Sequence, residues 1–172
     1  TEESTSICSS SSVNLGEFAP EGTVWYENQV CTEPIQTTTV FPTDNKTYYA
    51  KAKDGECLSS EYTELTINVT TTPVITANKL VTTIDSPITL TSNIDAIWTT
   101  TGGILNPNSE ETSSVEFTSQ NNGRYIITAS NTANNITCSA SKEVSVQNAF
   151  YVYIRRPKSG DNVYNDWYGK TN

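Results

Sequence analysis

The chain has 172 residues, and its composition excludes several classes of protein. It carries 19 acidic against 10 basic side chains, and the resulting formal net charge of -9 would repel phosphate backbones, so nucleic acid is not an expected partner. No stretch approaches the roughly 20 apolar residues that a membrane span needs. Only 35% of residues are apolar, and threonine is abundant. Because threonine suits a pleated, half-solvated strand, this composition predicts an all-β chain.

One sequence pattern occurs twice along the chain. A short strand-like run leads to a lone tryptophan, then to a tyrosine in a second strand-like run, then to a cysteine and a closing alternation. The first copy comprises residues 13–15, Trp25, Tyr48, Cys57 and residues 64–69. The second comprises residues 88–90, Trp98, Tyr125, Cys138 and residues 142–146. An immunoglobulin-like sandwich uses these parts as inner strand B, a core tryptophan on strand C, a tyrosine on strand F and strand G. The repeat therefore predicts two tandem immunoglobulin-like β-sandwiches with a short C-terminal tail.

The expected domain boundaries follow from the linker segments between the repeats. Residues 70–73 read Thr-Thr-Thr-Pro, and proline cannot continue a strand ladder. We therefore expect one Ig-like domain over residues 1–70 and a second over residues 71–147. Residues 148–172 form an aromatic-rich tail or the start of a further domain. Since the chain begins at Thr1 without a methionine, we interpret it as a piece of a longer, processed or trimmed protein.

The first copy resembles a known family of repeats. The resemblance rests on Ile7-Cys8, Val24-Trp25-Tyr26, residues 47–50, residues 54–57 and the closing run at residues 65–69. This arrangement is similar to the Ig-like repeats of Bacteroidota surface proteins, which occur in long adhesins, gliding-motility proteins and multidomain enzymes exported by type IX secretion. The resemblance implies a spacer or adhesive module that is secreted or held at the cell surface.

The four cysteines are expected to form disulfides. They contain no Cys-x-x-Cys pair, and the chain has no histidine to complete a zinc shell. The resembling repeats tend to carry Cys8 and Cys57 together, which favours that pairing. Sandwich geometry instead places Cys31 at the same end as Cys8, so Cys8–Cys31 stays open. In either case Cys138 is free or bridges to the first domain.

Seven aromatic residues divide into two groups. Trp25, Trp98, Tyr48 and Tyr125 occupy the tryptophan and tyrosine positions of the repeat, and we expect them in the two cores. Trp167 instead lies among aromatic and short polar residues, a mixture that carbohydrate sites use. Tyr164, Trp167 and Tyr168 are therefore candidate contacts to a glycan or a partner, and the alternative is that they open a further domain.

The sequence contains few residues or motifs that could support catalysis or bind a cofactor. There is no histidine, no serine nucleophile turn and no phosphate loop, so we expect no enzyme activity and no catalytic residues. Calcium oxygens could come from residues 44–45 or from residues 161–166, but both lack the ligand count and the turn glycine of a recognised loop. We expect no metal or other cofactor.

These observations favour a non-catalytic stalk or adhesin segment of an exported bacterial surface protein, located outside the cell. Its expected partners are other domains of the same protein, and a polysaccharide or another surface protein is a further candidate. Two alternatives stay open. One is a carbohydrate-binding accessory module of a secreted polysaccharide-degrading enzyme. The other is a filament subunit whose strand-forming tail, from residue 150, pairs with a neighbouring molecule.

Overall fold

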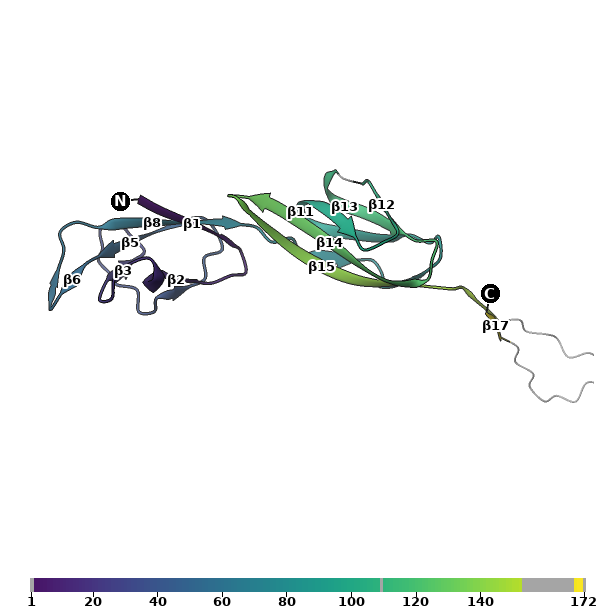
Figure 1. Ribbon diagram of the computed structural model, residues 1–172, viewed down its shortest axis with the longest axis horizontal. Coiled ribbons are helices and arrows are strands. Elements are labelled where there is room, and N and C mark those ends of the chain that lie inside the picture. The colour runs from purple at the N-terminus through teal and green to yellow at the C-terminus, as the bar shows by residue number, and fades with distance from the viewer. Residues whose placement is uncertain (1, 109, 153–168, 172) are drawn as a thin grey trace, which may run out of the picture. The chain divides into compact units, whose positions relative to one another are not determined.

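The computed structural model describes residues 2–108, 110–152 and 169–171. The chain forms two compact units (Figure 1). Unit 1 contains Thr1–Val74 together with Ser130–Ala140, and unit 2 contains Ile75–Ala129 together with Ser141–Asn172. The described elements are strands, apart from the 3-10 turn η1 at Leu15–Glu17. The all-β, Ig-like fold that the sequence predicts is thereby confirmed.

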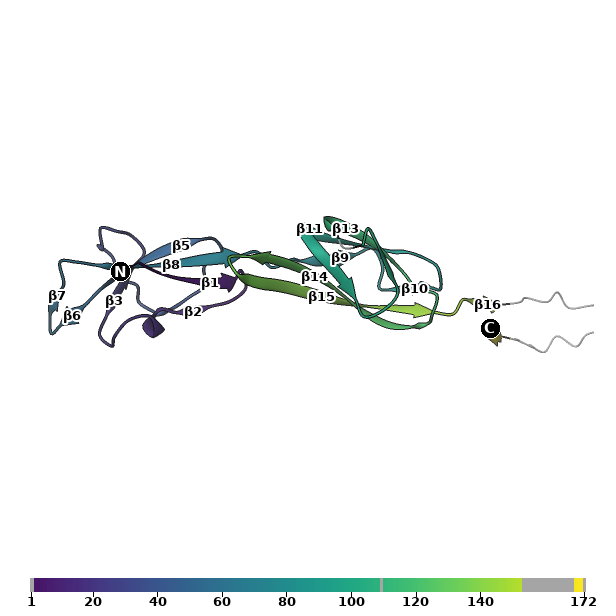
Figure 2. The same cartoon turned by 45° about the horizontal axis from the view of Figure 1, so that its top comes forward.

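The main sheet of unit 1 joins the first strand of the chain to the last strand of the first repeat. Its order is β1 (Glu2–Cys8), β8 (Thr63–Thr70), β5 (Lys46–Lys51) and β3 (Val24–Tyr26). Strand β1 runs parallel to β8, whereas β8 with β5 and β5 with β3 are antiparallel. Both ribbon views show β1, β8 and β5 side by side (Figures 1 and 2).

Short strands complete unit 1 around its core. Strand β2 (Val13–Asn14) pairs with β4 (Thr39–Val40), and β6 (Lys53–Asp54) pairs with β7 (Cys57–Leu58). Alternation along β8 and β5 turns one face of the main sheet inward, as expected for a sheet with one solvated face. The buried core is Val13, Leu15, Trp25, Val40, Tyr48, Ala50, Leu65 and Ile67.

A seven-stranded sheet supplies most of unit 2. Its path is β10 (Val81–Thr83), β15 (Ile136–Gln147), β14 (Gly123–Ala133), β11 (Ile88–Thr100), β13 (Glu111–Thr118) and β12 (Ile104–Asn106), and β9 (Ile75–Ala77) pairs with β11. The long strands β14 and β15 lie next to each other in both ribbon views (Figures 1 and 2). Strand β10 pairs with β15 in parallel.

Strand β11 differs from the sequence-based expectation. The runs at residues 88–90 and 97–98 were expected as two separate strands, B and C, but they belong to one continuous strand. The pairing of β11 with β13 changes register between Thr91 and Ala96. A register shift of this kind bends a strand without ending it, so the polar residues between the two apolar runs do not form a turn.

The tail contains a strand pair of its own. Strand β16 (Phe150–Val152) pairs antiparallel with β17 (Gly169–Thr171), and Phe150 lies opposite Thr171. The β-rich run at the start of the tail was expected to extend strand G, to begin a third domain or to join a neighbouring molecule. In the described residues it pairs with the C-terminal segment of the same chain.

Candidate functional site

The most distinctive local structure is the two-residue turn between β14 and β15. Strand β14 ends at Ala133 and β15 begins at Ile136, so Asn134 and Asn135 alone connect them. Both residues have positive φ, 51° and 62°. A two-residue hairpin with two left-handed positions matches the twist of its strands, and asparagine tolerates this conformation better than most residues.

Residues near this turn belong to unit 1, where they contact the end of β8. The Thr70 hydroxyl donates to the carbonyl of Ala133 at 3.0 Å and accepts from the Asn134 side-chain amide at 3.3 Å. The amide of Asn131 donates to the carbonyl of Thr71 at 2.9 Å. Thr70 is only 1% exposed, so its hydroxyl needs these partners. We call Thr70, Thr71, Asn131, Ala133 and Asn134 the hairpin contact.

A disulfide between Cys8 and Cys138 lies beside the hairpin contact. Their Cα atoms are 5.6 Å apart, and Cys138 is 1% exposed. The bond corrects the expectation that Cys8 pairs with Cys57. Cys8 stands opposite Thr70 at the end of β8, whereas Cys57 precedes the start of β8. The length of that strand, about 20 Å, separates the two ends and exceeds the reach of a disulfide.

The other two cysteines are free thiols in the structure. Cys57 is exposed on β7, and Cys31 is half-buried. Cys31 has a φ of 51°, and its Sγ donates to the carbonyl of Gln29 at 3.5 Å. The Cys8–Cys31 alternative is therefore also wrong.

Three of the four repeated aromatic residues that were expected in the cores, Trp25, Trp98 and Tyr48, are buried, whereas Tyr125 is half-buried. Trp25 is 4% exposed and Trp98 is 3% exposed, so neither indole can stack on a ligand at the surface. Trp98 Nε1 donates to the carbonyl of Thr112 at 2.8 Å, which satisfies its buried polar group. Tyr48 is buried, and this burial is the main reason that its pKa is raised above the ordinary value. Nearby Lys46 opposes the shift in pKa.

Tyr125 is half-buried and uses its hydroxyl to fix the approach to β14. The hydroxyl donates to the carbonyl of Asn121 at 2.9 Å and accepts from Ser119 Oγ at 2.8 Å. Its ring lies 5.2 Å from that of Phe117. A tyrosine whose hydroxyl bonds to backbone a few residues upstream is a feature of Ig-like sandwiches, and it anchors the corner before strand F.

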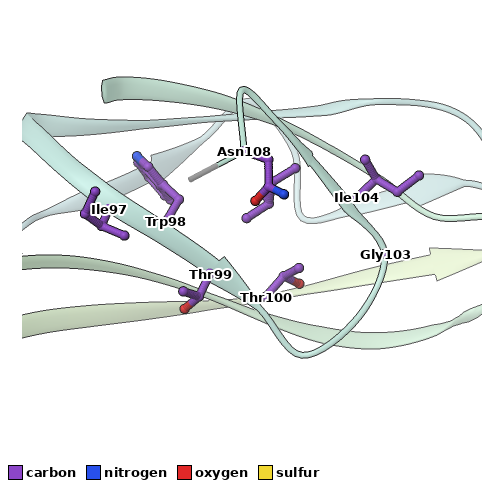
Figure 3. Close-up of a pocket in the computed structure, with 8 residues that line it drawn as sticks. Ile97, Trp98, Thr99, Thr100, Gly103, Ile104 and Asn108 are labelled. Atoms are coloured by element: carbon purple, nitrogen blue, oxygen red, sulfur yellow. The ribbon is translucent and has the colours of Figure 1, made fainter. Parts of the chain in front are cut away.

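A recess of about 470 Å³ lies in unit 2 between the end of β11 and the loop around β12. Figure 3 shows Ile97, Trp98 and Thr100 along one side and Ile104 and Asn108 along the other. Ile104 is 61% exposed at its rim, whereas the large ring of Trp98 is covered. Among the described residues that line the recess none has a charged side chain, so these residues offer little chemistry for recognition.

The remaining sequence candidates fall in two places. Tyr164, Trp167 and Tyr168 lie outside the described residues, as do the calcium candidates at residues 161–166. Asn45 is described, and its side-chain oxygen accepts from the backbone N–H of Val69 at 2.7 Å, so it caps a neighbouring strand. Within the described ranges no group of three acidic, cysteine or histidine side chains could hold a metal ion. No helix in the same ranges is long and apolar enough to cross a membrane.

Several solved structures are similar to this chain. The D00-D0 domain of Intimin is 17% identical with a TM-score of 0.38, over 78% of this chain and 81% of that chain. The N-terminal four Ig domains of Dscam1 isoform 7.44 are 14% identical with a TM-score of 0.37, over 85% of this chain and 44% of that chain. Domains 3–5 of Drosophila OTK are 14% identical with a TM-score of 0.39, over 84% and 58%. TM-scores this low support no conclusion about the fold or the function of this chain.

Sequence comparison assigns the first part of the chain. None of the curated proteins compared with the chain matches it significantly. Residues 1–73 match the family described as Ig-like domain, CHU_C associated. This match confirms the resemblance to Ig-like repeats of Bacteroidota surface proteins. The segment over residues 1–73 is therefore similar to the family of CHU_C-associated Ig-like domains, and this match covers less than half of the chain.

Proposed function

We propose that this chain is a non-catalytic stalk segment of an exported bacterial surface protein, which holds other regions of that protein away from the cell. The observation that carries the proposal is the Cys8–Cys138 disulfide. Disulfides persist in oxidising compartments outside the cytosol, which favours an exported protein. The bond also spans 130 positions and joins the two repeats in one covalent loop, as suits a spacer that must keep its structure outside the cell.

The surface chemistry of the described residues supports a spacer more than a binding module. Trp25 and Trp98, the two tryptophans within the described ranges, are buried in the two cores. Carbohydrate recognition relies on exposed aromatic faces and on polar groups placed around them. The recess in unit 2 offers the covered edge of Trp98, and its described lining residues include no charged group.

A replacement experiment in the intact surface protein tests the proposal. We would exchange residues 1–147 for two unrelated Ig-like domains of similar length and measure the adhesion of cells to their natural substrate. A stalk is replaceable, so adhesion should persist after the exchange and fall after simple deletion of the same residues. Loss of adhesion in the exchanged protein, at unchanged surface expression, would instead make this segment the binding module.

A further inference from the structure

The disulfide determines which part of the chain bears mechanical tension when the chain is stretched. Cys8 and Cys138 are 130 positions apart in sequence but are joined directly through their sulfur atoms. When a chain is pulled from both sides of such a bond, tension passes through the bond, and the residues of the closed loop are not stretched. This holds for any arrangement of the two units, because it follows from covalent connectivity alone.

We propose that the Cys8–Cys138 bond is the tension-bearing connection of this stalk, so that residues 9–137 stay unloaded while the protein is under force. The proposal rests on the stalk function proposed above. Tension would run along β1 to Cys8, across the disulfide to Cys138, and onward along β15. The interior strands of both repeats would then keep their fold at forces that stretch the rest of the chain.

The two cysteines occupy suitable positions for this role. Cys8 is the last residue of β1, and Cys138 is the third residue of β15, which continues to Gln147. Strand β1 therefore connects Cys8 to the N-terminal side of the chain, and the rest of β15 connects Cys138 to the C-terminal side. The hairpin contact holds the two sites together independently of the bond, because Thr70 faces Cys8 in the sheet and bonds to Ala133 and Asn134 of the turn.

Without the bond, tension would take a different path. It would enter at the start of β1 and leave from the end of β8. These two strands are parallel over seven facing pairs, from Glu2 with Glu64 to Cys8 with Thr70. Pulling them in opposite directions loads their hydrogen bonds together in shear, which resists force until the strands slide apart. Unit 1 would then unravel, and unit 2 would follow.

The two paths differ greatly in maximum length. An extended chain spans at most about 3.3–3.6 Å per residue. The loop of 130 positions therefore stores roughly 450 Å of length that the bonded chain cannot release. The residues outside the loop supply only about 150 Å when fully stretched.

Single-molecule force spectroscopy on the full chain tests this difference. Handles would be attached enzymatically at both ends, since thiol handles would react with Cys31 and Cys57. The maximum end-to-end extension of the oxidised chain should be about 150 Å. The variant that carries both Cys8→Ser and Cys138→Ser should extend roughly 450 Å further. The Cys31→Ser with Cys57→Ser variant keeps the bond and should retain the short limit.

The measurement stays informative if the Cys8→Ser/Cys138→Ser variant folds poorly, because an unfolded chain also reaches the long limit. The proposal would be overturned if the oxidised, unmodified chain extended to the longer limit. It would also be overturned if the Cys8→Ser/Cys138→Ser variant stopped at the shorter limit. The result is separable from the replacement experiment. If the oxidised chain extends to the longer limit but adhesion survives the exchange, the tension path is rejected and the stalk function is kept. If the oxidised chain stops at the shorter limit but adhesion is lost after the exchange, the stalk function alone is rejected.

Discussion

The turn at Gly103 gives the sharpest test of packing in unit 2. Gly103 has a φ of 76°, and a Cβ added there would lie 2.6 Å from Phe117 Cε2 and 2.7 Å from the carbonyl oxygen of Thr118. Phe117 is fully buried and cannot move aside freely. The left-handed conformation costs an L-residue about 1–2 kcal/mol, and overpacking a core costs about 1–3 kcal/mol. Gly103→Ala should therefore lower the stability of unit 2 by about 2–5 kcal/mol.

Gly102→Ala is the matched control in the same turn. Its added Cβ would lie 3.2 Å from Cε1 of Tyr125, and a displacement of a few tenths of an ångström relieves this contact. We expect a loss below about 1 kcal/mol, as is usual for changes at partly exposed sites. Hydrogen exchange of peptides from β11, β13 and β14 would report the free energy of opening in unit 2. Equal losses for the two alanine variants would refute the argument from the Phe117 contact.

Three further predictions address the cores and the tail. Trp25→Ala and Trp98→Ala should each destabilise their own unit by about 3–5 kcal/mol in hydrogen exchange, and unchanged stability with weaker glycan binding would contradict their core role. The raised pKa of Tyr48 means that the unfolded chain loses this proton first above about pH 10, so stability should fall there as pH rises. Tyr48→Phe should flatten that decline in alkaline denaturation, whereas a similar effect of Tyr49→Phe would point to a general cause. Trp167→Ala should leave retention on insoluble polysaccharide unchanged if the chain is a stalk, and a loss worth about 0.5–1.5 kcal/mol would support a sugar platform.

The repeated landmarks made the fold class predictable. Trp25 and Tyr48 in the first copy, and Trp98 in the second, are large apolar groups within β-forming runs, and the structure buries all three. Such residues are informative because a thin sandwich has few other ways to fill its core. Tyr125 is less deeply buried than these residues, and the contact of its hydroxyl with the carbonyl of Asn121 was not predicted from the sequence.

The pairing of distant segments could not be predicted in the same way. Strand β1 reads Glu-Glu-Ser-Thr-Ser-Ile-Cys, which lacks the apolar alternation of a buried strand. Its place beside β8 depends on backbone hydrogen bonds and on the position of the edge, neither of which leaves a clear sequence signal. The Cys8–Cys138 bond was predicted only in part. The sequence left open a bridge from Cys138 to the first domain, but it favoured Cys57 or Cys31 as the partner of Cys8, because the hairpin that places Cys138 in unit 1 was not foreseen.

Two sequence features could have indicated this arrangement. The second repeat has no cysteine ahead of residue 88, so Cys138 lacks a partner within its own repeat. The dipeptide Asn134-Asn135 offers two residues that tolerate positive φ, which favours a tight turn shortly before Cys138. Together these features favour a partner outside the second repeat.

The composition of unit 1 has a consequence for how such modules can be inherited. The sequence family ends at residue 73, but the physical unit also includes Ser130–Ala140. A gene segment cut at the family boundary would encode a domain with an unpaired Cys8 thiol and a Thr70 hydroxyl stripped of its partners. Duplication or transfer of the single repeat would therefore produce a damaged domain, whereas the pair carries everything that unit 1 requires. The smallest segment of this chain that keeps both the disulfide and the Thr70 contacts is therefore the pair of repeats.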